Sequence, residues 1–258
     1  MQSTQHIKRY WDDRAKERGH QKNATVKDWH LRDLETDVIK RHLKPSDNVL
    51  DIGCGNGDPT LECACVVRNI VGIDFSETMV EAAKKKLMTR RVRNAEFLCV
   101  DAHDLPYKEG EFDSVIVSRL LINLPTFASK CKVIDEAERV LKNDGLLLLL
   151  EATIQGHKST NRIRRSFGLP NLKKHWHNAY VDEEQMTAYL QRRFTITTTH
   201  RFSMYMFLSK VFYPLLVRPK EPEFLSKANA IAATVSRKIL EIENCPIGHN
   251  LLWVLKKI

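Results

Sequence analysis

The chain has no long hydrophobic run, and none of its apolar stretches approaches the ~20 residues that a membrane-spanning helix needs. Leu146–Leu150 contains only five consecutive leucines, which suits a central β-strand. The first residues, Met1 to His6, have no apolar segment of the kind found in a signal peptide. These absences predict a cytoplasmic protein without a membrane span.

The cysteines also have no pattern that would indicate a disulfide framework. Six of them occur in 258 residues, at positions 54, 63, 65, 99, 131 and 245. Cys63 and Cys65 are close together, but no second pair of metal ligands follows them. We therefore expect free thiols in a reducing compartment and no metal site.

Acidic residues are the minority charge, since 41 Lys and Arg outnumber 32 Asp and Glu to give a net charge of +9. The excess of cations raises the expectation of an anionic partner, including nucleic acid, without identifying one. A hydrophobic content of 43% and a charged content of 28% are typical of a globular chain, and the length suits one domain.

The glycine-rich stretch Val49–Gly57 lacks the features of a phosphate-binding loop. An apolar run ends in Asp51, and glycines follow at alternate positions, 53, 55 and 57. A dinucleotide fingerprint would require a glycine at position 58, which is Asp58, and the Lys-Ser/Thr pair of a P-loop is missing. The stretch predicts a buried strand and a tight turn, either at a phosphate-free ligand or as a purely structural turn.

Acidic residues also end the next two predicted strands. Asn69–Asp74 ends in Asp74, which lies 23 residues after Asp51, and Glu96–Ala102 ends in the pair Asp101-Ala102. Further strands are predicted at Phe112–Ser118 and at the leucine run that ends in Glu151. Strands that alternate with helices and carry polar residues at their carboxyl ends predict a doubly wound parallel sheet.

The series acid-x-Gly-x-Gly-x-Gly, then an acid, then Asp-Ala resembles the motifs of class I S-adenosylmethionine (SAM)-dependent methyltransferases over residues 40–155. The resemblance implies an α/β fold with a doubly wound, seven-stranded, mostly parallel sheet and helical lid insertions. Its last two strands are expected near Phe194–His200 and Leu251–Lys257, the latter antiparallel. SAM has no phosphate and carries positive charges, so an acidic turn suits it, and the product would be S-adenosylhomocysteine.

The resemblance also assigns expected roles around the cofactor. Asp74 would accept hydrogen bonds from both ribose hydroxyls, although it could instead cap a helix, a role for which Ser76 is available. Asp101 would accept from the adenine amino group, and the Ala102 N–H would face a ring nitrogen. The complete predicted set is Tyr10, Asp51, Gly53, Gly55, Asp74, Phe75, Met79, Asp101, Ala102 and Ser118.

Some of these residues have a second interpretation. Phe75 and Met79 could contact the adenine or belong to the core. Tyr10 lies in a predicted N-terminal helix that either folds over the cofactor or packs its aromatic residues on the body of the domain. The basic run from Lys84 to Arg93 falls at the C-terminus of a predicted helix and is interpreted as a solvated face rather than a nucleic-acid track.

The single domain is predicted to have four parts. Residues 1–44 form the N-terminal lid and helices, 45–155 the SAM-binding core, and 156–193 and 203–248 two insertions on the substrate side. The helix after the fourth strand places Ile134, Ala137 and Leu141 on one face and ends near 143–145. The second insertion contains an apolar lid helix, whose alternatives are a dimer surface or ordinary core.

The first insertion contains the candidate catalytic residues. It combines several Arg and Lys residues with the sequence His175-Trp176-His177-Asn178, a set that suits an anionic or hydroxyl-rich ligand but also occurs in ordinary basic loops. His177 is the first candidate for a general base and His175 the second, while Arg119 could orient the acceptor. Each histidine could instead be a packed or surface residue.

The acceptor is predicted less directly. The stretch Ser118–Pro125 lacks the Asn/Asp-Pro-Pro-aromatic motif that methyltransferases of nucleic-acid amines carry. The sequence of this stretch, together with the later His-Trp-His-Asn, is similar to the sequences of methyltransferases that modify surface sugars or secondary metabolites. We expect O-methylation of a small, sugar-like or anionic molecule. The alternatives are an RNA methyltransferase, which the charge permits, and a SAM-binding protein without catalysis, and the sequence leaves the oligomeric state open.

Overall fold

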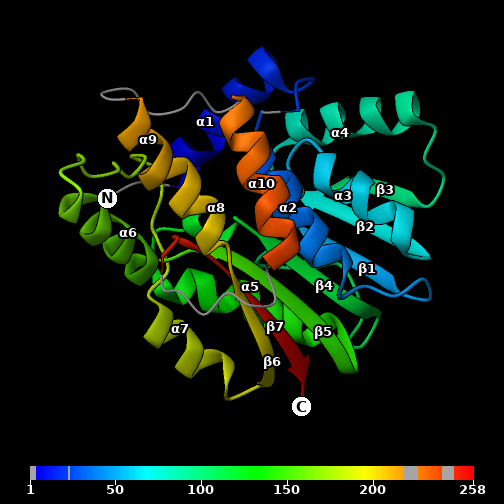
Figure 1. Ribbon diagram of the computed structural model, residues 1–258. Helices are drawn as coiled ribbons and strands as arrows, with labels where there is room; N and C mark the ends of the chain where they lie inside the picture. The colour runs from blue at the N-terminus through cyan, green and yellow to red at the C-terminus, as the bar shows by residue number, and fades with distance from the viewer. Residues whose placement is uncertain (1–3, 23, 218–225, 240–246) are drawn as a thin grey trace.

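The computed structural model describes residues 4–22, 24–217, 226–239 and 247–258. A seven-stranded sheet with the order β3-β2-β1-β4-β5-β7-β6 forms its centre (Figure 1). The strands are β1 (Asn48–Ile52), β2 (Asn69–Asp74), β3 (Ala95–Cys99), β4 (Phe112–Ser118), β5 (Leu141–Ala152), β6 (Phe194–Arg201) and β7 (Asn250–Lys257).

The sheet confirms the predicted fold class. Neighbouring strands from β3 to β5 pair in parallel, while β7 runs antiparallel to both β5 and β6. The order of the strands reverses between β1 and β4, and ligands of open α/β sheets bind beside the carboxyl ends of the strands at such a point.

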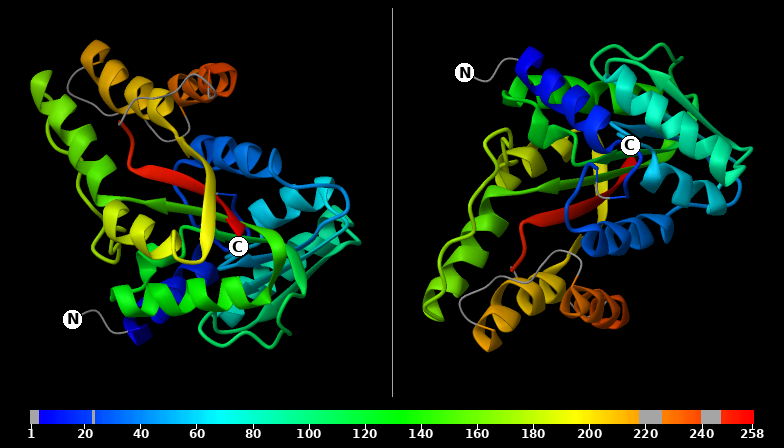
Figure 2. Two further views of the ribbon diagram at one scale, coloured as in Figure 1. Left: turned by 90° about the horizontal axis from the view of Figure 1, so that it is seen from below. Right: turned by 90° about the horizontal axis from the view of Figure 1, so that it is seen from above.

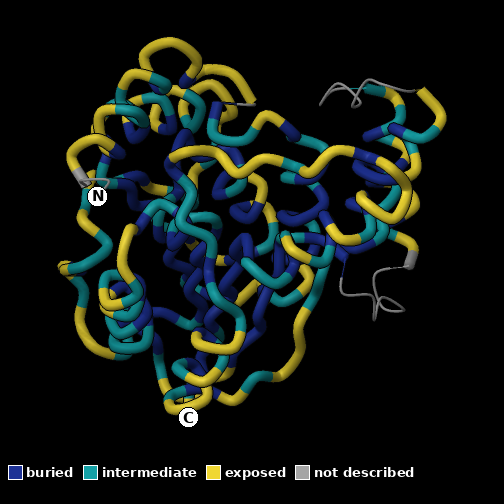
Figure 3. Tube along the Cα trace, turned by 90° about the vertical axis from the view of Figure 1, so that its left-hand side faces the viewer, coloured by how far each residue is buried: buried dark blue, intermediate teal, exposed yellow. Residues whose placement is uncertain are grey.

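Alternating side chains of β5 divide the core into two layers. Leu147 and Leu149 pack with residues of helices α5 (Phe127–Val140) and α7 (Glu183–Leu190), whereas Leu148 and Leu150 pack with residues of other helices on the opposite face. Side chains of a strand point alternately to the two faces of the sheet, so the leucine run is buried on both. Figure 3 shows the buried strands inside and the exposed segments outside.

The opposite face carries α2 (Trp29–Lys40), α3 (Asp58–Cys63) with the 3₁₀ turn η1 (Ala64–Val66), α8 (Ser203–Phe207) and α10 (Lys227–Ile239). Helix α4 (Glu77–Arg90) covers β2 and β3 and packs against the N-terminal helix α1 (Thr4–Arg18). The remaining elements are the 3₁₀ turn η2 (Leu121–Asn123), α6 (Ile154–Ser166), the π-helical turn η3 (Leu208–Phe212) and α9 (Tyr213–Leu216). Figure 2 shows how these elements lie around the sheet.

Two local predictions were wrong. The helix after β4 ends at Val140, and Leu141 is the first residue of β5, where it is extended and pairs with Phe112. Leu141 is fully buried as a strand residue. Its apolar side chain also fits the periodicity of the preceding helix, and for this reason the predicted helix was too long. Residues 143–145 lie inside β5 at an irregularity of register, and there Asp144 has a φ of 62°.

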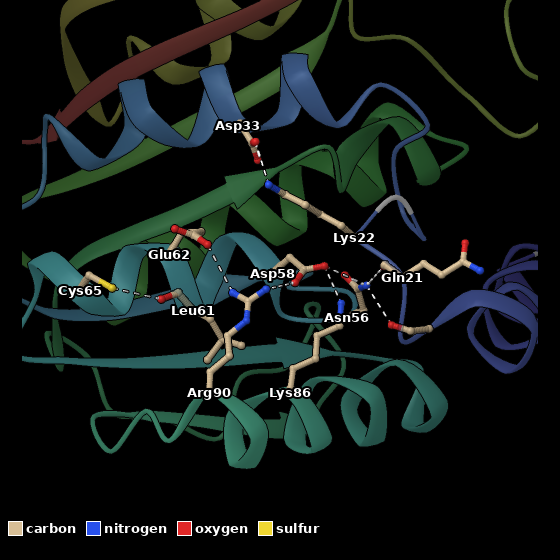
Figure 4. A network of polar contacts seen from close by, with 11 residues as sticks. Gln21, Lys22, Asp33, Asn56, Asp58, Leu61, Glu62, Cys65, Lys86 and Arg90 are labelled. Carbon is tan, nitrogen blue, oxygen red and sulfur yellow. Dashed lines mark hydrogen bonds and ion pairs between the residues drawn. The ribbon is translucent and has the colours of Figure 1, made fainter. Parts of the chain in front are cut away.

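The basic run is also not simply a solvated face. Lys86 Nζ lies 2.5 Å from one carboxylate oxygen of Asp58, and Arg90 Nη2 lies 2.7 Å from the other (Figure 4). These ion pairs join α4 to α3, and Arg90 also reaches Glu62 at 3.3 Å. Part of the basic run therefore neutralises the acid that follows the glycine turn.

The next three observations concern the cysteines, metal-binding groups and membrane spans of the described residues. Cys54, Cys63, Cys65, Cys99 and Cys131 are free thiols, and Cys245 lies outside the described residues. No group of three His, Cys, Asp or Glu side chains within the described ranges could hold a metal ion. None of the helices in those ranges is long and apolar enough to cross a membrane.

Candidate active site

A cavity of about 610 Å³ lies at the carboxyl ends of the parallel strands. The turns after β1, β2 and β4 form its floor, while α1 and the segment 170–180 form two of its walls. It brings together ten of the thirteen predicted site residues. These are Tyr10, Gly53, Gly55, Asp74, Phe75, Met79, Ser118, Arg119, His175 and His177.

The glycine turn has a backbone that only glycine adopts readily. Gly53, Gly55 and Gly57 have φ values of 80°, 56° and 77°. A side chain at Gly57 would clash, because a Cβ there would lie 2.7 Å from the ring of Phe97. The backbone N–H groups of Gly53 and Cys54 donate to the carbonyl of Ile73 at 2.8 and 2.9 Å, which joins the turn to β2.

Asp74 is fixed at the end of β2 beside this turn. Its carboxylate accepts hydrogen bonds from the backbone N–H of Gly55 at 3.0 Å and of Ser76 at 2.9 Å. Burial raises the pKa of Asp74 to about 6, even though these two N–H donors favour the charged form. A buried carboxylate that lines the cavity beside two glycines can accept hydrogen bonds from the hydroxyls of a nucleoside.

Three predicted cofactor residues lie outside the cavity lining. Asp51 is buried and accepts a hydrogen bond from Thr60 Oγ1 at 2.6 Å, and burial raises its pKa. The Asp101 side chain is 70% exposed, and its carboxylate contacts His103 Nδ1 at 2.7 Å. Ala102 follows it and does not line the cavity either. Their expected contacts with the cofactor remain predictions.

Hydrogen bonds from the glycine turn hold the end of helix α1 beside the cavity. The amide of Asn56, which lies between Gly55 and Gly57, donates to the carbonyls of Gly19 at 3.0 Å and Gln21 at 2.9 Å (Figure 4). Farther along the cavity, Trp11 Nε1 donates to Asn123 Oδ1 at 3.3 Å. The two bonds from Asn56 connect the segment that follows α1 to the glycine turn, and the bond from Trp11 connects α1 to η2.

The two candidate histidines meet α1 at the cavity wall. The ring centroid of His177 lies 4.5 Å from that of Tyr10, and the rings of His175 and His177 are 5.8 Å apart. His177 is buried, and its Nδ1 has no hydrogen-bond partner within the described chain. Burial, followed by the neighbouring His175 and Arg14, lowers the pKa of His177 to about 4, so its imidazole is neutral at pH 7.

Arg119 occupies a strained backbone position directly after β4. Its φ is 58°, which is uncommon for a residue with a side chain, and its N–H donates to the Leu150 carbonyl at 2.8 Å. The guanidinium forms two hydrogen bonds to Glu35 of α2, from Nε at 3.0 Å and from Nη2 at 2.6 Å. Burial opposes the charge of Arg119, but Glu35 more than offsets this effect and raises its pKa.

Glu35 is a site residue that was not predicted from the sequence; it is fully buried and also accepts a hydrogen bond from Asn250 of β7. The sequence does contain an indication that Glu35 is buried, because this residue interrupts the apolar face formed by Leu31, Leu34 and Val38. A carboxylate on the buried face of a helix needs a cationic or hydrogen-bonding partner. The partner itself could not be identified from the sequence.

Glu151 and Lys130, two buried residues of opposite charge, were also not predicted from the sequence. The Glu151 carboxylate at the end of β5 accepts from the backbone N–H of Leu121 at 2.6 Å, and Lys130 Nζ donates to the carbonyl of Ala179 at 2.6 Å. Burial raises the pKa of Glu151 and lowers that of Lys130, while their opposite charges partly offset this. The pair joins η2 and the end of the segment 170–180 to the sheet.

These features fit SAM in chemical terms. Gly53 and Gly55 present backbone without side chains to the cavity, and the cavity lacks a P-loop lysine beside them. Asp74 provides a carboxylate for hydroxyl groups, and Phe75 and Met79 provide apolar surface next to it. A phosphate-free nucleoside with a positively charged sulfur matches this combination of groups.

Comparison with known proteins agrees with this fit. A family model described as a methyltransferase domain matches residues 43–190. Demethylmenaquinone methyltransferase of Staphylococcus saprophyticus is 32% identical over 130 residues, which are 49% of this chain and 52% of that protein. The corresponding protein of Lactococcus lactis is 38% identical over 109 residues, or 41% and 42% of the two chains. The chain thus spans about half the length of these relatives.

Solved structures support the fold. A SAM-dependent methyltransferase of Methanosarcina mazei superposes with a TM-score of 0.56 at 20% identity, covering 86% of this chain and 97% of that one. Phosphoethanolamine N-methyltransferase 1 of Haemonchus contortus, in complex with S-adenosylhomocysteine, gives 0.65 at 17% identity, covering 100% of this chain and 50% of that one. At such identities the likeness concerns the fold alone.

Proposed function

This chain belongs to the SAM-dependent methyltransferases, and we propose from that premise that it methylates a hydroxyl group of a small polar molecule, such as a sugar or secondary metabolite. The observation that supports the proposal is one continuous cavity that contains both sets of residues. Gly53, Gly55 and Asp74 line the same space as Arg119 and His177. A volume of about 610 Å³ suits small ligands.

SAM supplies an electrophilic methyl group on a sulfonium that is a good leaving group. The chain must therefore orient the acceptor, exclude water and take up one proton. We propose that Gly53 and Gly55 admit the cofactor to the backbone of the turn, that Asp74 accepts from the ribose hydroxyls, and that Tyr10 covers this end of the cavity together with His177.

We assign the proton to His177. Its neutral imidazole has a nitrogen without a partner within the described ranges, and it lies in the wall of the cavity. An imidazole with a pKa of about 4 is a weak base. It would accept the proton only as the acceptor oxygen gains the methyl group and becomes strongly acidic. His175, which is exposed beside it, is the second candidate.

The test is transfer of a labelled methyl group from SAM to fractions of a cell extract, combined with calorimetry of SAM binding. We expect label in a small-molecule fraction, and we expect His177→Ala to reduce the rate while SAM binding remains. Label confined to an RNA fraction would contradict the proposal. SAM binding without transfer to any fraction would indicate a non-catalytic protein instead.

A further inference from the structure

Three polar side chains form a continuous series of hydrogen bonds outside the cavity lining. Asp101 and His103 lie in the loop that follows β3, and Ser129 lies in the first turn of α5. Asp101 Oδ1 is 2.7 Å from His103 Nδ1, and His103 Nε2 is 2.7 Å from Ser129 Oγ. None of these three residues lines the cavity that contains the glycine turn. The lining of the methyl-transfer site therefore does not account for their arrangement.

The carboxylate of Asp101 determines which nitrogen of His103 carries the proton. Burial raises the pKa of Asp101, but hydrogen bonds from the backbone and ring of His103 more than offset this effect and lower it. A carboxylate can only accept, so His103 Nδ1 is the donor. In the neutral imidazole Nε2 then has a lone pair, and the Ser129 hydroxyl donates to it. A serine that donates to an oriented histidine has the geometry of an activated nucleophile.

The loop fixes Asp101 and His103 relative to each other. The backbone N–H of His103 donates to Asp101 Oδ1 at 2.9 Å, and the N–H of Asp104 donates to the Asp101 carbonyl at 3.2 Å. An aspartate that accepts from the backbone two residues later stabilises a tight turn of this kind. The turn therefore holds the carboxylate beside the imidazole.

Further hydrogen bonds hold this loop against α5. Glu136 of α5 accepts from the N–H of Leu105 at 2.8 Å, and Arg139 donates to the carbonyls of Leu105 and Tyr107 at 2.9 and 2.7 Å. Leu105 is also buried in the core. Because the same helix carries Ser129, the loop and the serine are positioned together. A nucleophile and a base that are held in place in advance need little reorganisation before they react.

The serine lies at the surface and at the start of a helix. The His103 side chain is 26% exposed, and Ser129 is half-buried. Thr126 Oγ1 accepts from the Ser129 N–H at 3.1 Å, so the N–H groups of Phe127 and Ala128 are the remaining donors of this first turn. The partial positive charge of a helix N-terminus stabilises an oxygen that becomes negative beside it.

We propose that Ser129, His103 and Asp101 form a second reactive site, at which Ser129 takes the acyl group of a small carboxylic ester. The Ser129 oxygen bonds to the carbonyl carbon while its proton passes to His103 Nε2. The bond between that carbon and the alcohol oxygen breaks, and the alcohol leaves with this proton. Water then gives a proton to Nε2 and attacks the acyl carbon. The carboxylic acid is released, and the serine oxygen regains its proton from His103.

Asp101 is the positioning residue of this site, since it acts through His103. Its role is compatible with the contact to the adenine amino group that the sequence predicts. Both hydrogen bonds from His103 end on Oδ1, so Oδ2 can accept from another donor. The ester reaction itself is independent of methyl transfer, because it uses neither SAM nor a residue that lines the cavity.

The test is reaction of the full-length protein with a fluorophosphonate, which modifies activated serines, followed by mass spectrometry of its peptides. We expect modification of Ser129. Ser166 is the control within the same sample, because it is exposed but its hydroxyl donates to the Arg162 carbonyl instead of a histidine. We also expect hydrolysis of p-nitrophenyl acetate, and Ser129→Ala should abolish it.

Two variants separate the base from the residue that orients it. His103→Gln can still accept from Ser129 but is not a base, and we expect modification to slow about a hundredfold. Asp101→Asn presents an amide to the imidazole, and we expect modification to slow about tenfold or more because the tautomer is wrong. Long-range ¹H–¹⁵N spectra should show His103 in the Nδ1–H form in the unmodified protein and a loss of that form in Asp101→Asn.

The inference is overturned if Ser129 is not modified, or if it is modified no faster than Ser166. The comparison of these two serines is made within the unmodified protein, so it does not depend on the folding of any variant. An unchanged rate of modification in His103→Gln, with S-adenosylhomocysteine binding as the check that this variant is folded, would overturn it as well.

Discussion

Arg119 and Glu35 are 84 residues apart in the sequence, and their side chains form a bidentate ion pair with N···O distances of 3.0 and 2.6 Å. Glu35 is completely buried and Arg119 has a left-handed backbone. The pair therefore fixes the direction of a cation that lines the cavity. The geometry of this pair and of the glycine turn leads to four predictions.

Glu35→Gln should destabilise the protein by about 3 kcal/mol, because it leaves the guanidinium of Arg119, whose side chain is only 16% exposed, without its counter-charge. Denaturant unfolding measures the change. Glu62→Gln is the control, since Glu62 is half exposed and pairs with Arg90 at the surface, where we expect a change below about 1 kcal/mol. Equal effects of the two substitutions would refute the structural role of Glu35.

Asp74→Asn should weaken SAM binding at least tenfold at pH 7.5, because an amide is a poorer acceptor for hydroxyl groups than a carboxylate. Calorimetry of SAM binding measures this. Asp144→Asn is the matched control, since Asp144 is exposed and pairs with Lys256. We expect that control to bind SAM normally, and a tenfold loss there as well would argue against a specific contact.

The pH dependence of the ligand-free protein should also depend on Asp74. Its pKa of about 6 in the folded state is above the usual value of 3.8, so between these values the folded state binds more protons than the unfolded state. The contribution of Asp74 is therefore fully present below pH 3.8 and is lost as the pH rises through 6. Asp74→Asn should lack this loss of unfolding free energy, and identical pH profiles of the two proteins would contradict the assignment.

Gly57→Ala should destabilise the protein by about 2 to 4 kcal/mol, because a Cβ there combines a φ of 77° with a contact of 2.7 Å to Phe97. Gly110→Ala separates the two causes. Gly110 has a φ of 67°, but the nearest atom to its Cβ would be 3.9 Å away, so only the backbone strain of about 1 kcal/mol remains. Thermal unfolding measures the stability of both variants. A smaller loss of stability in Gly57→Ala than in Gly110→Ala would contradict this prediction.

The sequence by itself determined the sheet and the residues that gather at the glycine turn in the cavity. Glycines at positions 53, 55 and 57 and the acid at 74 are local features, and each lies at the carboxyl end of a strand. Parallel strands bring those ends to one edge, so the topology alone places such residues together. Helix boundaries were less certain, because a buried residue such as Leu141 satisfies the pattern of a helix and of a strand equally well.

Only the tertiary structure decided which buried polar groups meet around the cavity. Glu35 of α2 meets Arg119, which follows β4, and His157 of α6 meets His249, which precedes β7, because the two helices pack near the ends of these strands. No spacing in the sequence encodes such contacts. Local periodicity specifies which face of an element is buried, whereas the partner of a buried polar group is chosen by the packing of distant elements.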